Sequence, residues 1–299
     1  MIRTINKKVM SVRPDHQHAT VGDLLEYKEQ MRVELEQLNT QVSGTALEAV
    51  LDKNWFQSVS KMIDEMGSAL SFMEQSYHLF RIFRDDQGMF DRLNTAICQI
   101  EVVAERTKRL RYFRETKQKL KSPVANQIQG AIFEFLILSS LIRLSNEKNL
   151  SIELYPKLPT GRGIEAKLWV NGRWCHFEAK ALGYSQHDVG MKLHASRVGF
   201  HNVESMVKQI TDALYEKGIQ LSGVPNAEPA IVFLALGYNA DFYSAPWGID
   251  EFFNSAKGKS VSAVVLHGSF LCKMPPSIFL NKMGRTPLVF SEEQILKSI

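Results

Sequence analysis

The chain has 299 residues, enough for one large domain or two of ordinary size. Hydrophobic residues make up 44% and charged residues 23%, which are normal fractions for a globular protein and exclude a fibrous or wholly disordered chain. The formal net charge of +4 is compatible with a polyanionic partner but does not require one.

Cysteine content and hydropathy predict a cytoplasmic protein. Cys98, Cys175 and Cys272 lie far apart and form no CxxC pair, which argues against a disulfide scaffold or a cysteine-rich zinc site. The N-terminal residues lack the apolar segment of a secretory signal. The most apolar stretch, residues 131–142, is too short to span a bilayer and contains Glu134, so we expect no membrane partner.

Residues up to about Lys121 have the apolar spacing of long α-helices. Apolar side chains recur every three or four residues in three successive runs, at residues 21–42, 56–80 and 90–104. The pattern predicts a helical bundle or coiled coil. The apolar stripes either pack on one another within the chain or form a dimerisation or partner surface; the second interpretation predicts a homo-oligomer.

The third helix is expected to continue into a strongly basic segment at residues 106–121. This segment contains eight Lys or Arg and a single acidic residue, Glu115. Such a density of positive charge favours binding to phosphates, because binding releases counterions. A solvated helix face is the alternative. The residues expected to contact nucleic acid here are Arg106, Lys108, Arg109, Arg111 and Arg114.

Ser122-Pro123 interrupts the helical pattern and predicts a domain boundary, with a helical domain at residues 1–122 and a second domain at 123–299. The second domain begins with a helix at 125–146 that is apolar almost all round and is therefore expected to be buried. A second helix is expected at 203–217. Strand-like runs stand at residues 151–155, 164–170, 173–180, 230–236 and 261–267. This order predicts an α/β fold with a mixed central sheet.

Two carboxylates are predicted to face each other on a hairpin. The Asn-Gly dipeptide at residues 171–172 is a strong hairpin signal, because a type I′ turn needs positive φ at both central residues. A two-residue loop sets Glu165 directly opposite Glu178, and such a pair is destabilising unless a cation such as Mg²⁺ or Mn²⁺ compensates it. Lys180 shares the face of Glu178, because side chains alternate along a strand. A solvent-exposed sheet surface is the alternative setting for this trio.

The tripeptide Glu178-Ala179-Lys180, with Glu165 on the preceding strand and Glu134 on the preceding helix, resembles the core of the PD-(D/E)XK nuclease superfamily. The resemblance covers roughly residues 125–270. It implies a restriction-endonuclease-like mixed sheet flanked by helices, preceded here by an all-α helical domain.

The resemblance also implies metal-dependent hydrolysis of phosphodiester bonds. Glu165 and Glu178, with the Ala179 carbonyl, would hold Mg²⁺ or Mn²⁺. Lys180 would position or help deprotonate the attacking water. Glu134 would anchor Lys180, a second metal or the water network.

The chain departs from the family pattern around the first acidic position. Glu165 stands where the family usually has Asp, and Ile164 replaces the preceding Pro. On the later helix, Gln209 matches a glutamine that some members carry, and Lys208 beside it is a further candidate. The tyrosine that follows four residues later in those members is absent.

Histidines and basic residues gather after the tripeptide. Zinc is not expected, because no cysteine pair supports it and the spacing of histidines in a glycine-containing loop means little. The histidines are His176, His187, His194 and His201. The candidates for phosphate contacts are His187, Lys192, His194 and Arg197. A polar surface loop is the alternative.

Together these features predict a Mg²⁺-dependent DNA endonuclease in restriction or anti-phage defence, with RNA as the alternative substrate. Phe253 stands where a phosphate-binding loop needs Gly, so any ATPase or sensor would be a separate subunit. Two other accounts stay open. One is a catalytically inactive nucleic-acid-binding module with the nuclease fold, and the other is a helical partner-binding protein.

Overall fold

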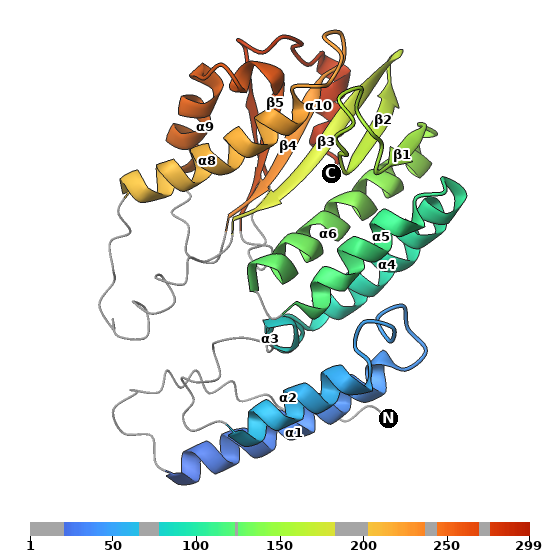
Figure 1. The fold of residues 1–299 in the computed structure, drawn as a ribbon, viewed down its shortest axis with the longest axis vertical. Coiled ribbons are helices and arrows are strands. Elements are labelled where there is room, and N and C mark those ends of the chain that lie inside the picture. The colour runs from blue at the N-terminus through green and yellow to red at the C-terminus, as the bar shows by residue number, and fades with distance from the viewer. Residues whose placement is uncertain (1–20, 66–77, 123–124, 183–202, 237–243, 269–275) are drawn as a thin grey trace, which may run out of the picture.

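The computed structural model describes residues 21–65, 78–122, 125–182, 203–236, 244–268 and 276–299. In this part of the chain a six-stranded mixed sheet has helices on both faces (Figure 1). The helices are α1 (Val21–Val42), α2 (Lys53–Glu65), α3 (His78–Asp85), α4 (Gln87–Arg106), α5 (Leu110–Gln118), α6 (Ala125–Lys148), α8 (Val203–Leu221), α9 (Ala245–Asn254) and α10 (Phe290–Leu296), with 3₁₀ turns η2 (Lys119–Lys121) and η3 (Gly258–Ser260). The strands are β1 (Ile152–Leu154), β2 (Ala166–Val170), β3 (Arg173–Ala181), β4 (Ala230–Ala235), β5 (Ala263–His267) and β6 (Ser277–Leu280).

The sheet has the mixed pairing that the sequence predicts. Its strands lie side by side in chain order from β1 to β6. β1–β2, β2–β3 and β5–β6 are antiparallel, whereas β3–β4 and β4–β5 are parallel and are connected through α8 and α9. The five predicted strands are confirmed with small shifts at their ends, and β6, α9 and α10 are additional elements. Antiparallel pairing brings β2 and β3 together at the hairpin that carries the acidic residues.

Each face of the sheet has its own core. On one face, α6 packs against the sheet over side chains such as Phe177 and Phe233, and α4 packs on α6 in turn. On the other face, α8 and α9 cover side chains such as Val232 and Leu234. The first core is continuous from α1 to the sheet, so it includes residues on both sides of the boundary predicted at Ser122-Pro123.

The predicted helices of the first half are present wherever the structure describes them. Apolar side chains at the predicted spacing, such as Leu35 on α1 and Val59 and Ile63 on α2, are buried in the core of the same chain. This burial agrees with packing of the stripes within the chain. A bundle or coiled-coil arrangement, and the homo-oligomer, stay predictions.

The prediction that the third helix continues into the basic segment is wrong, because α4 ends at Arg106 and α5 starts at Leu110. Lys108 has φ of 59°, the left-handed conformation that glycine usually supplies at a helix end. The N–H of Lys108 donates to the Glu105 carbonyl at 3.0 Å, and the N–H of Arg109 donates to the Ala104 carbonyl at 2.6 Å. These two bonds form a Schellman motif, which ends α4 without a glycine.

α6 is the one helix in the described ranges that is long and apolar enough to cross a membrane. In an apolar window of this helix, 72% is buried inside the molecule, against α4 and the sheet. This burial is typical of the core helix of a soluble protein and confirms the predicted burial of residues 125–146. A cytoplasmic location stays a prediction.

Candidate functional site

The register of the β2–β3 hairpin is the predicted one. Asn171 and Gly172 have φ values of 49° and 83°, as a type I′ turn requires. Ala166 pairs with Phe177, the last pair of the ladder, and Glu165 lies in the bend one residue before β2. The Asn-Gly turn therefore brings Glu165 and Glu178 to the same end of the hairpin, where one lysine contacts both.

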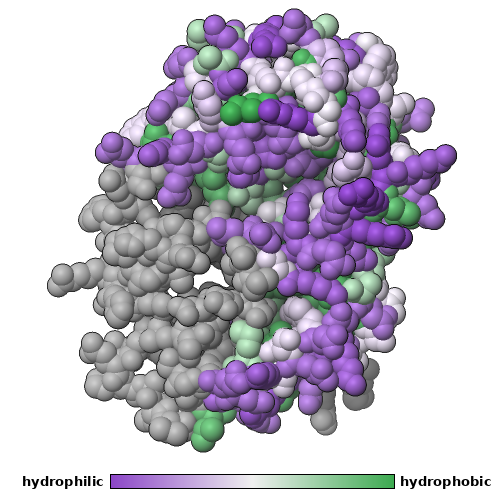
Figure 2. Space-filling view, viewed as in Figure 1, coloured by the Kyte–Doolittle hydropathy of each residue, from purple (hydrophilic) through white to green (hydrophobic). Residues whose placement is uncertain are grey.

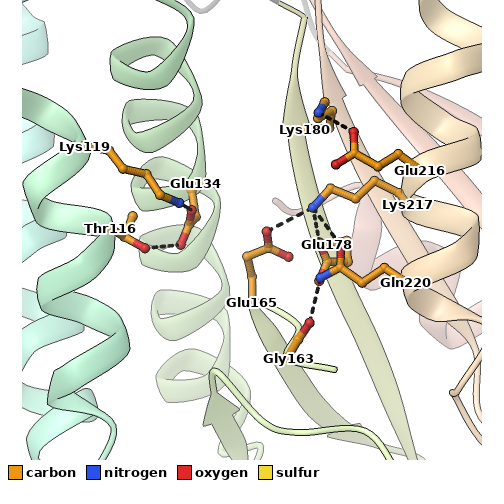
Figure 3. A network of polar contacts seen from close by, with 10 residues as sticks. All are labelled: Thr116, Lys119, Glu134, Gly163, Glu165, Glu178, Lys180, Glu216, Lys217 and Gln220. Atoms are coloured by element: carbon orange, nitrogen blue, oxygen red, sulfur yellow. Dashed lines mark hydrogen bonds and ion pairs between the residues drawn. The ribbon is translucent and has the colours of Figure 1, made fainter. Parts of the chain in front are cut away.

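An ammonium group from α8 joins the two carboxylates. Glu178 is fully buried, and one of its oxygens accepts a short hydrogen bond from the Lys217 Nζ atom. The same Nζ atom lies 3.5 Å from Glu165 Oε1 (Figure 3). Burial lowers the pKa of Lys217, but the charges of Glu165 and Glu178 outweigh burial and raise its pKa above the ordinary value. Lys217 is therefore charged and compensates the opposed carboxylates.

Gln220, one helical turn after Lys217, occupies the second oxygen of Glu178. Its Nε2 atom donates to Glu178 Oε1 at 2.7 Å and to the Gly163 carbonyl at 2.6 Å. Burial raises the pKa of Glu178, and the charge of Glu165 adds to the rise, whereas Lys217 opposes it. Sequence reasoning missed Lys217 and Gln220. The feature of the sequence that could have identified them is their spacing of three residues on a helix that follows the acidic hairpin.

Lys180 is not part of the contact between Lys217 and the two carboxylates. Its Nζ atom is 2.7 Å from Glu216 Oε2, and its side chain is 31% exposed. It stands on the predicted face of β3, but the structure pairs it with α8 rather than with Glu165 or Glu178 (Figure 3). Lys180 and Lys217 therefore occupy different positions around the acidic pair.

Glu134 faces the acidic pair from α6. Thr116 Oγ1 donates to Glu134 Oε1 at 3.1 Å, and Lys119 Nζ lies 3.8 Å from Oε2. In Figure 3, Glu165 lies between Glu134 and Lys217. Burial, reinforced by the charge of Glu165, raises the pKa of Glu134 to about 7 against the opposing effects of Lys119 and Thr116. Glu134 is therefore a carboxyl of this site whose protonation can change near neutral pH.

Tyr155 is a residue of this site that sequence reasoning missed. It has φ of 51°, an outlier for an aromatic residue, and its N–H donates to the Glu165 carbonyl at 2.7 Å. Its hydroxyl is buried and makes no hydrogen bond of normal geometry in the described residues, although Thr116 and Glu134 lie close enough to influence its pKa. Burial, followed by the charge of Glu134, raises the pKa of Tyr155 well above its ordinary value. No pattern in the sequence marks this residue, because its position depends on the turn after β1.

The donor chemistry fits a hard divalent cation. Glu165 and Glu178 supply carboxylate oxygens, and Glu165 Oε2 is buried without a hydrogen-bond partner within the described ranges. Ala179, the third predicted ligand, is half-buried on β3 beside Glu178. No group of three or more His, Cys, Asp or Glu side chains lies close enough to hold a metal in the described part of the chain. The site therefore offers a cation two carboxylates rather than a full cage.

The basic segment borders the site through its C-terminal part, since Thr116 and Lys119 contact Glu134. Arg109 lies 3.6 Å from Glu153, and Arg111 pairs with Glu115 at 3.0 Å. The other predicted nucleic-acid contacts are exposed: Arg106, Lys108 and Arg114. The same segment therefore carries both the side chains that contact Glu134 and several exposed cations.

The remaining candidates lie elsewhere. His187, Lys192, His194, Arg197 and His201 fall outside the described residues. Lys208 is exposed and Gln209 half-buried on α8, and Gln209 stands eight residues before Lys217, about 12 Å along the helix. His176 is buried and lies 2.5 Å from Glu228. None of these three described residues contacts the acidic pair.

The chain was compared with known proteins at three levels. No protein family, no curated protein and no solved structure matches it. The argument for function therefore rests on the geometry of Glu134, Glu165, Glu178 and the side chains that hold them.

Proposed function

We propose that the chain is a metal-dependent nuclease with a restriction-endonuclease-like core. The observation that carries the proposal is the convergence of Glu165 and Glu178 on Lys217 at one end of the β2–β3 hairpin, with Glu134 on α6 near enough for the charge of Glu165 to affect its pKa. The order of elements also supports it: α6, three antiparallel strands, the crossover helix α8 and the parallel strand β4 follow the layout of the PD-(D/E)XK core.

Glu165 and Glu178, with the Ala179 carbonyl, are the residues that would hold Mg²⁺ or Mn²⁺. A bound divalent cation supplies Lewis acidity toward a phosphate and lowers the pKa of a coordinated water. Glu134, with a pKa of about 7, exchanges a proton near neutral pH and suits general acid–base work beside Glu165. Lys180, partly exposed at the rim, is placed to attract a phosphate through its ammonium group.

The substrate we propose is DNA, with RNA as the alternative. The exposed cations Arg106, Lys108 and Arg114 favour a polyanion, because a phosphate backbone releases counterions when such residues bind it. A cytoplasmic role in restriction or anti-phage defence, a homo-oligomeric state and a separate ATPase or sensor subunit belong to the same proposal.

A second function is favoured by one specific observation. Both oxygens of Glu178 are hydrogen-bonded, one to Lys217 and the other to Gln220, and the carboxylate is fully buried. A site closed in this way is also what a nuclease fold without catalysis would show. The alternative is therefore an inactive module that binds nucleic acid.

The test is incubation of the full chain with supercoiled and linear DNA in Mg²⁺, Mn²⁺ or EDTA. Glu165→Gln is the informative variant, because Glu165 makes one 3.5 Å contact and its replacement leaves the buried Lys217–Glu178 pair intact. Glu153→Gln is the matched control, since Glu153 lies on the neighbouring strand and pairs with Lys167 at 2.9 Å.

We expect metal-dependent cleavage that falls to the EDTA level in Glu165→Gln and stays within about threefold of wild type in Glu153→Gln. Salt-sensitive retention of DNA without cleavage in any metal would favour the inactive module instead. Cleavage that survives in Glu165→Gln would show that another set of residues carries the reaction.

A further inference from the structure

Lys217 stands where a bound cation would have to interact with the acidic pair. Its Nζ atom contacts both carboxylates, Glu178 through a short hydrogen bond and Glu165 at 3.5 Å (Figure 3). Its side chain is 10% exposed, while that of Glu178 is completely buried. The ammonium is therefore a cation that the chain itself supplies to this pair.

The side chains of α8 do not provide a partner for every oxygen of the acidic pair. Glu165 Oε2 is buried and unpartnered in the described structure. The Tyr155 hydroxyl is also buried without a hydrogen bond, on a side chain that is 7% exposed; burial and then the charges of Glu134 and Glu165 disfavour its ionisation. A buried polar atom without a partner is costly, so both atoms are available to a bound ligand.

We propose that the Lys217 ammonium and a divalent cation compete for Glu165 and Glu178, so that Lys217 sets the metal affinity of the site. This inference rests on the proposed function, since it concerns the same two carboxylates. Two cations between these carboxylates repel each other, so a bound divalent ion drives the ammonium away. Gln220 Oε1, 3.2 Å from Nζ, provides an acceptor that the displaced ammonium retains.

Lys217 is thus a positioning residue that has two effects on the site. In the metal-free chain it holds Glu165 and Glu178 together and prevents their repulsion. Competition lowers the apparent affinity for the metal, so the site fills only when the divalent cation is abundant enough to displace the ammonium.

The experiment measures Mn²⁺ binding to the full chain by isothermal titration calorimetry. Lys217→Gln removes the charge and keeps a polar side chain. Lys167→Gln is the matched control, because it removes an ammonium on β2 that pairs with Glu153 at 2.9 Å and not with the acidic pair. We expect Lys217→Gln to bind Mn²⁺ at least tenfold more tightly than wild type, and Lys167→Gln to stay within about threefold.

Each other outcome is decisive. Equal or weaker Mn²⁺ binding by Lys217→Gln overturns the competition. If Lys217→Gln unfolds without metal, recovery of its fold in Mn²⁺ but not in NaCl of equal ionic strength supports the inference, and failure to recover overturns it. Tighter binding by Lys217→Gln with no DNA cleavage by wild type would leave the inference standing and remove the nuclease proposal. Absence of Mn²⁺ binding in both folded proteins would remove both.

Discussion

Tyr155 combines a left-handed backbone with a buried hydroxyl that makes no hydrogen bond of normal geometry in the described structure. Both features cost free energy, which the hydrogen bond from the Tyr155 N–H to the Glu165 carbonyl offsets in part. Residues of this kind are retained at functional sites, where the strain places a group that a ligand will use. At the scale of single residues, Tyr155 thus differs from Lys217 and Gln220, whose side-chain polar groups make hydrogen bonds.

The first prediction at this scale is that Tyr155→Phe does not lower stability. The change removes a polar atom that is buried without a hydrogen bond, so the melting temperature should stay the same or rise by a few degrees. Tyr112→Phe is the control, because the Tyr112 ring stacks on that of Tyr155 at 6.3 Å between centroids. Differential scanning calorimetry decides the matter. A clear drop in melting temperature specific to Tyr155→Phe would mean that the hydroxyl has a structural partner.

Glu134 gives a prediction about pH. Its pKa is raised from 4.5 to about 7, so the folded chain holds a proton there that the unfolded chain releases between these values. The free energy of unfolding therefore falls as pH rises from about 4.5 to 7, with a slope from this group of up to about 1.4 kcal/mol per pH unit. Glu134→Gln removes this contribution.

Urea unfolding at several pH values measures the effect. Glu134→Gln should gain stability relative to wild type as pH rises from 5 to 8, with metal chelated throughout. Glu153→Gln, on the neighbouring strand, should keep the pH dependence of wild type. Parallel curves for wild type and Glu134→Gln would contradict the raised pKa.

At the scale of elements, the junction between α4 and α5 is the clearest case in which local sequence misleads. The apolar and basic pattern runs on through residues 106–109, and no glycine or proline marks a break. The helix ends because Lys108 adopts a left-handed conformation that two backbone hydrogen bonds stabilise. A lysine in this conformation bears a steric cost that a glycine avoids.

We therefore predict that Lys108→Gly stabilises the chain by about 1 kcal/mol relative to Lys108→Ala. The alanine variant loses the same charge but keeps the β-carbon, so the comparison isolates the backbone conformation. Chemical denaturation of the two variants provides the measurement. If alanine proves as stable as glycine, the junction does not have the left-handed conformation in solution.

The elements also show why part of the site was predictable. The Asn-Gly turn fixes the register of β2 and β3 up to the Ala166–Phe177 pair, so the approach of Glu165 and Glu178, one residue beyond that pair, follows largely from the local sequence. The ammonium that joins them comes from α8, 39 residues after Glu178. Which lysine reaches the pair depends on how α8 packs on the sheet, and local patterns do not encode that packing. The same reasoning explains why the sequence points to Lys180 and does not identify Lys217.

At the scale of the whole molecule, the described residues on the face shown in Figure 2 are mostly hydrophilic, and the interior holds two separate cores, one on each face of the sheet. Periodicity predicted the α/β class and the mixed sheet, because both depend on patterns within single elements. The predicted division at residue 122 comes from a local break in the pattern. The core that continues across that position is formed by residues distant in sequence, such as Ile97 on α4 and Leu138 on α6, so the sequence alone did not reveal it.

This shared core limits which parts of the chain can be replaced. α6 carries Glu134 on the side of the acidic pair and is packed on its other sides by α4 and the sheet. A substitute for the first 122 residues would therefore have to reproduce the surface that α6 buries. We expect substitutions on the exposed helix faces to be tolerated more readily than substitutions in this shared core.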